Sequence, residues 1–137
     1  MSPPRQASLP RRVWVGSFEF SLTRVPRDHP RLRDDEDPDE ISAVDGMTYF
    51  EPHDRAIFVA DDLPPRNLLD TVLHELTHAL NYAFDVKDGD DDRLLGDEEQ
   101  LALRQGGGWS AVWVDNPRLQ AWLVRTVNQI RKEQKAA

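Results

Sequence analysis

The sequence predicts one α+β domain, in which a small antiparallel sheet packs on a core of about three helices. Two observations lead to this class. Segments rich in β-branched and aromatic residues lie mainly in the first 60 residues, and segments with apolar residues at helical spacing follow them. A chain of 137 residues is long enough for one domain with its own hydrophobic core and too short for two such domains. We expect this domain to span residues 13–135, after a flexible arm of residues 1–12.

Three segments are predicted to form the sheet. Residues 12–24 contain the run VWVGSFEF, which indicates a strand. Residues 47–51 and 56–60 indicate the two strands of a hairpin, joined by a turn over residues 52–55. Residues 25–40, with three prolines and an acidic run, are predicted to form a mobile loop to which we assign no function.

Three helices are expected after the sheet. The first covers residues 66–84 and follows two prolines, which a first helical turn tolerates. The second begins near Asp97 and contains Gly106–Gly108, each costing about 1 kcal/mol in a helix interior relative to alanine. These glycines therefore predict either close approach to the first helix or a helix break. The third helix follows the turn Asp115-Asn116-Pro117 and has an apolar stripe of Leu119, Trp122, Leu123, Val127 and Ile130.

The first helix contains the run His74-Glu75-Leu76-Thr77-His78. At about 100° per residue, its apolar residues gather on one side around Leu76, and both histidines lie on the opposite side. This placement disfavours histidines packed in the core and leaves a solvated polar face as the alternative to metal binding. The apolar residues are Leu68, Leu69, Val72, Leu73, Ala79, Leu80, Ala83 and Phe84.

Two histidines one helical turn apart can bind one metal ion, and a glutamate beside the first can serve as a general base. Because the chain has no cysteine, a zinc ion would have to be held by histidines and carboxylates. The sequence thus predicts a Zn²⁺ site with His74 and His78 as ligands. Glu75 is the predicted base, which takes a proton from a zinc-activated water.

A catalytic zinc ion usually has three protein ligands, so a third must come from elsewhere. A metzincin-type continuation would need glycine at position 81 and histidine at position 84, where this chain has Asn81 and Phe84. Glu98 is favoured because it shares a face of the second helix with apolar residues. The alternatives are Glu99, Asp85 and His53, and both glutamates could simply stabilise the helix N-terminus. Candidates for an additional oxyanion stabiliser are Tyr82 and His53.

Residues 71–80 resemble the active helix of zincin-type metallopeptidases, and residues 45–125 resemble small zincin-like proteins of bacteriophage and prophage genomes. In that group a hairpin precedes the active helix, and a Glu-Glu segment and an Asp-Asn-Pro turn follow it. The resemblance implies a zincin-like fold and a protein that hydrolyses a protein or peptide substrate. It also implies that His74, His78 and Glu98 bind zinc and that Glu75 is the base. The alternative is a non-enzymatic phage structural or accessory protein that retains a zinc site.

The charge distribution limits the possible partners. The net charge is −8, and residues 34–99 carry four basic against twenty-one acidic residues, so we expect no general nucleic-acid binding. No apolar stretch is long enough to cross a membrane, and no secretory signal is recognisable, so we expect a soluble protein of the cytoplasm, or of the host cytoplasm if phage-encoded. Residues 88–99 space their acids like a calcium loop, but Arg93 stands where that loop needs glycine.

Overall fold

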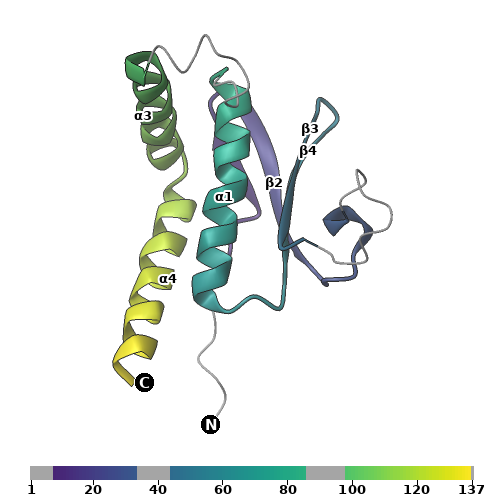
Figure 1. Ribbon diagram of the computed structural model, residues 1–137, viewed down its shortest axis with the longest axis vertical. Coiled ribbons are helices and arrows are strands. Elements are labelled where there is room, and N and C mark those ends of the chain that lie inside the picture. Colours follow the sequence, from purple (N-terminus) through teal and green to yellow (C-terminus); the bar gives the residue numbers. More distant parts are fainter. Residues whose placement is uncertain (1–7, 34–43, 86–97, 137) are drawn as a thin grey trace.

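The computed structural model describes residues 8–33, 44–85 and 98–136 (Figure 1). Within these ranges the chain forms a four-stranded sheet, a short 3-10 helix and three α-helices. The elements are β1 (Arg12–Val15), β2 (Phe18–Val25), η1 (Pro30–Leu32), β3 (Gly46–Glu51), β4 (Asp54–Ala60), α1 (Pro65–Ala83), α3 (Glu98–Asp115) and α4 (Pro117–Ala136). The predicted arm, the acidic run and the calcium-type loop lie wholly or largely outside the described residues.

The predicted α+β class is confirmed, but the sheet is mixed and not wholly antiparallel. Its strand order is β1-β2-β4-β3, and β2 pairs in parallel with β4, whereas the two outer pairs are antiparallel. Four of the seven β4 residues are buried, whereas none of the β3 residues is. A strand that lies between two others is more buried than an edge strand, and β4 is the more apolar strand of this hairpin. The second strand of the β3–β4 hairpin therefore takes the central place, and this makes its pairing with β2 parallel.

The prediction of one strand over residues 12–24 was wrong, because this segment forms the β1–β2 hairpin. The chain reverses at Gly16 and Ser17, and Gly16 has a φ of 61°. This left-handed backbone conformation strongly favours glycine. A Gly-Ser pair between two runs of β-branched and aromatic residues is a sequence signal for a tight hairpin. The predicted hairpin of residues 47–60 is confirmed, with a tighter turn at Pro52 and His53.

Helix α1 lies between the sheet on one side and α3 and α4 on the other, and those two helices follow one another along its length (Figure 1). The predicted first helix is thus confirmed to within one residue at each end. Its apolar stripe faces inward, as expected. The buried residues of α1 are Leu68, Val72, Glu75, Leu76, Ala79 and Leu80, and only Glu75 among them is charged.

Helix α3 continues through its three glycines without a break. A Cβ atom added to Gly108 would lie 3.0 Å from Leu80 Cγ and 3.0 Å from Phe84 Cδ2, so α3 approaches α1 closely at this residue. A Cβ at Gly106 or Gly107 would have no neighbour within 4 Å. The expected close approach to the first helix is therefore found at one glycine of the three.

Helix α4 presents most of its predicted stripe to the core. Leu119, Trp122 and Ile130 are buried, but Thr126 is buried in place of Val127, whose exposed fraction is 37%. Among the described residues, no helix is long and apolar enough to cross a membrane.

Candidate metal centre

The two histidines of the motif lie side by side on the exposed face of α1. Their Nε2 atoms are 3.1 Å apart and their ring centroids 4.8 Å apart. Two nitrogen ligands of one tetrahedral zinc ion, each at about 2.0–2.1 Å, lie roughly 3.3 Å from each other. The observed spacing thus fits two neighbouring positions on one ion, and it is also a hydrogen-bond distance between the two rings. The histidine pair is accessible, because both residues are exposed.

Glu75 differs sharply from the histidines in its burial. Its side chain is 7% exposed, against 68% for that of His74. Carboxylate oxygen Oε2 accepts a hydrogen bond of 2.5 Å from the Thr48 hydroxyl, and Oε1 lies 4.0 Å from His74 Nε2. One oxygen is therefore held by strand β3, and the other lies toward the histidine pair.

Strand β3 contacts α1 closely at this place. A Cβ atom on Gly46 would lie 2.8 Å from Thr71 Cγ2 and 2.9 Å from Glu75 Cγ, which is closer than packed carbon atoms approach. Where β3 begins, a surface depression of about 460 Å³ lies beside the motif. It is lined by Val44, Asp45, Gly46, Met47, Asp70, Thr71, His74 and Glu75.

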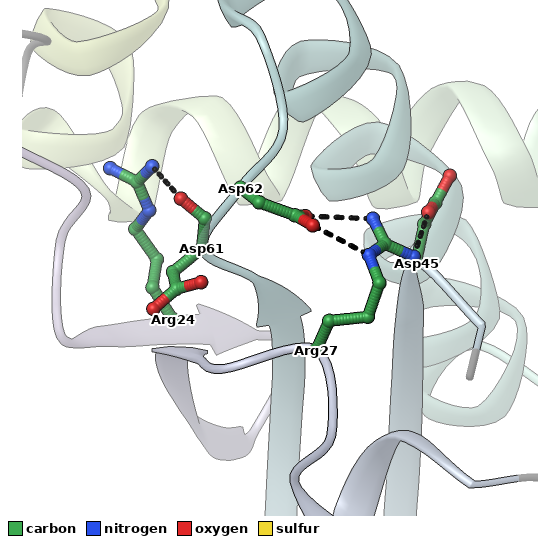
Figure 2. Close-up of polar contacts among 5 residues, drawn as sticks. All are labelled: Arg24, Arg27, Asp45, Asp61 and Asp62. Carbon is green, nitrogen blue, oxygen red and sulfur yellow. Dashed lines mark hydrogen bonds and ion pairs between the residues drawn. The ribbon is translucent and has the colours of Figure 1, made fainter.

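An ion-pair cluster connects the segments at this end of the sheet (Figure 2). The Arg27 guanidinium contacts Asp45 at 2.9 Å and both carboxylate oxygens of Asp62 at 2.7 and 2.8 Å. Hydrogen bonding to Arg27 lowers the pKa of Asp62, and hydrogen bonding to both acids raises the pKa of Arg27. Asp45 precedes β3 and Asp62 precedes α1, and these two elements form the depression. The cluster therefore holds together the two segments that lead into β3 and α1.

Three of the four candidates for the third ligand can be located. His53 is exposed in the β3–β4 turn, Asp85 lies after α1 with its carboxylate 3.9 Å from Arg104, and Glu99 is exposed on α3. Within the described part of the chain, no three histidine, aspartate or glutamate side chains converge as a metal site.

Glu98, the favoured candidate, is the first residue of α3, and its side chain lies outside the described residues. Helix α3 runs antiparallel to α1 (Figure 1). Gly108 lies against Leu80 and Phe84. At a rise of about 1.5 Å per residue, the ten residues back to Glu98 extend roughly 15 Å toward the C-terminal end of α1, away from the histidines. Glu98 would bind their metal only if the start of α3 lay closer to them. Its role stays a prediction.

The two candidates for oxyanion stabilisation come from different elements, Tyr82 from α1 and His53 from the β3–β4 turn. Tyr82 follows His78 by one helical turn, and its ring packs between Phe18 and Phe50 with centroid distances of 5.4 and 4.9 Å. Tyr82 is 43% exposed. His53 lies at the hairpin turn, five residues beyond Thr48, the β3 residue that contacts Glu75. Tyr82 is therefore the better placed of the two.

Sequence reasoning missed the contribution of β3 to the site. Gly46 lies just before the predicted strand of residues 47–51 and carries no signal of its own. Thr48 carries none either, because its partner Glu75 lies 27 residues away in the chain. Comparisons with protein-family models, with curated proteins and with solved structures found no match to this chain.

Proposed function

We propose that this protein is a zinc-dependent metallopeptidase that hydrolyses peptide bonds of a protein or peptide substrate. One observation above all supports the proposal: an exposed histidine pair with Nε2 atoms 3.1 Å apart stands beside a buried carboxylate whose oxygen Oε1 lies 4.0 Å from His74. In this proposal His74 and His78 hold the ion and Glu98 is the third ligand. A cytoplasmic location is part of the proposal.

The roles of the residues follow from their positions. When bound, zinc would lower the pKa of a coordinated water toward about 7 and polarise a carbonyl group. Glu75 Oε1 would accept the proton of the attacking water and deliver it to the leaving amine. Its partner oxygen Oε2 is engaged by Thr48, so the two oxygens of this carboxylate have separate tasks.

The exposed edge of β3 supports a peptide as the substrate. Asp45 accepts a hydrogen bond from the Ala60 N–H at 2.8 Å, so alternate residues from Asp45 onward pair with β4. The backbone groups of Gly46, Thr48 and Phe50 consequently face away from β4. No other strand of the described residues pairs with this edge. An extended peptide could bind it through backbone hydrogen bonds and would then lie beside Glu75.

The test is a comparison of wild type with Glu75→Gln on a peptide library and on an unfolded-protein pool. We expect wild type to cleave peptide bonds and the variant to lose this activity, by more than about 100-fold, since general base catalysis contributes about 10²–10⁴. Zinc content and thermal stability should stay nearly unchanged, because glutamine preserves the shape of the side chain. A wild-type protein that binds zinc but cleaves nothing in these pools would favour the structural or accessory role.

A further inference from the structure

Resting on the proposed function, we infer that Gly46 and Thr48 of strand β3 are positioning residues for the catalytic base. They are two residues apart and so present the same face of the strand. That face meets α1, where the Thr48 hydroxyl donates to Glu75 and a Cβ atom on Gly46 would lie 2.9 Å from Glu75 Cγ. The base would thus be oriented by the strand that we propose to bind the substrate, as well as by its own helix.

Thr48 determines which carboxylate oxygen is free to act. Its hydroxyl has one proton to donate, and it lies 2.5 Å from Glu75 Oε2 and 3.2 Å from the Glu75 backbone oxygen. The shorter contact, to the charged group, is the stronger hydrogen bond. With Oε2 held in this way, the side chain keeps one orientation, and Oε1 remains as the oxygen that faces His74.

Gly46 makes this contact possible. A methyl group at position 46 would lie 2.9 Å from Glu75 Cγ, 2.8 Å from Thr71 Cγ2 and 3.2 Å from the Phe58 backbone oxygen. A larger residue would have to push β3 away from α1 or displace the Glu75 side chain. Gly46 therefore allows β3 to pack closely on α1, and the Thr48 hydroxyl then reaches the Glu75 carboxylate.

The catalytic test compares Thr48→Val, Thr48→Ser and a matched control, Thr126→Val, which alters a buried threonine of α4. We expect Thr48→Val to lower kcat by about 10- to 100-fold, the size typical of a misplaced catalytic group, with KM changed less than about twofold. Thr48→Ser should restore most of kcat because it keeps the donor. Zinc content should be equal in all variants. An unchanged kcat in Thr48→Val, or a loss that serine does not restore, would overturn the inference.

A glycine pair extends the same test. Gly46→Ala should lower kcat at least as much as Thr48→Val, whereas Gly107→Ala, where an added Cβ meets nothing within 4 Å, should leave it unchanged. Equal kcat values for the two alanine variants would contradict the role of Gly46.

A second measurement uses the metal-free protein and needs no activity. The unfolding midpoints of Thr48→Val, Glu75→Ala and the double variant should be non-additive, because either single change already removes the hydrogen bond. Thr126→Val combined with Glu75→Ala should be additive. If wild type proves inactive, the proposed function fails, and these midpoints still decide on the contact. Additive effects of Thr48→Val and Glu75→Ala would show that Thr48 does not hold the carboxylate.

Discussion

The side-chain amide of Asn116 pairs with both backbone groups of Trp14. Asn116 Oδ1 accepts from the Trp14 N–H at 2.7 Å, and Nδ2 donates to the Trp14 carbonyl at 2.7 Å. The amide occupies the outer edge of β1 as a neighbouring strand would. It also donates to the carbonyl of Val112 at 2.7 Å, so one residue connects the sheet edge to the α3–α4 junction.

Replacing this residue should destabilise the fold without affecting the histidine site. Asn116→Ala leaves two backbone carbonyls and one N–H without their partner, which costs about 1–3 kcal/mol for a buried group. Urea unfolding measures the loss, and Asn128→Ala, an exposed change on α4, is the control and should stay within about 0.5 kcal/mol of wild type. Equal free energies of unfolding for the two variants would mean that the pairing contributes nothing.

The three glycines of α3 should separate into two classes when each is changed to alanine. Gly106→Ala and Gly107→Ala meet open space and should stabilise the protein by about 0.5–1 kcal/mol each, because alanine favours the helix. Gly108→Ala places its methyl group 3.0 Å from Leu80 Cγ and should destabilise the protein by about 1–3 kcal/mol. Chemical denaturation of the three variants gives the ranking. Stabilisation by Gly108→Ala equal to that of the other two would rule out the close approach of α3 to α1.

Local patterns were enough to predict the parts of the fold that depend on neighbouring residues. Helix α1, the β3–β4 hairpin and most of the α4 stripe follow from periodicity and turn residues. The parallel pairing of β2 with β4 did not, because it depends on which strand of a hairpin joins the rest of the sheet. The burial of Thr126 in place of Val127 also depends on helix packing that the stripe alone does not determine.

The residues of the candidate site also fall into two groups, those that the sequence predicted and those that depend on tertiary packing. His74, Glu75 and His78 stand out because their spacing places them on adjoining faces of one helix. Thr48 and Gly46 reach Glu75 through tertiary packing between β3 and α1, and no pattern within either segment indicates that contact.

The Arg27 cluster gives a prediction about pH. Because Arg27 lowers the pKa of Asp62 below its ordinary value of 3.8, the carboxylate stabilises the fold at pH values above that point. This contribution is lost as the pH falls through the lowered pKa. Asp62→Asn should therefore lower the melting temperature at neutral pH, and its difference from wild type should shrink in strong acid. Asp61→Asn is the control, because its carboxylate points away from Arg27 (Figure 2). A difference between Asp62→Asn and wild type that does not change with pH would contradict the ion pair.

Zinc content tests the histidine pair as metal ligands. Purified protein should carry close to one zinc ion per chain, and the His74→Ala/His78→Ala variant should carry none, because each imidazole supplies a ligand. Full zinc retention in that variant would show that His74 and His78 do not bind the zinc ion.

The third ligand is decided by comparing two neighbouring variants of α3. Glu98→Ala should weaken zinc affinity by more than about 100-fold, beyond the roughly 10- to 100-fold loss typical of a residue that only supports a ligand. Glu99→Ala is the matched control, since Glu99 is exposed and one residue away, and it should change the affinity little. Competition with a chromogenic chelator measures both values. Gly108 lies beside Leu80, and the described position of α3 places Glu98 away from the histidines. The predicted loss therefore requires the start of α3 to lie closer to them when zinc is bound, and the experiment tests this movement as well. Equal zinc affinities for the two variants would show that Glu98 is not a ligand. The third ligand would then have to come from another part of the chain.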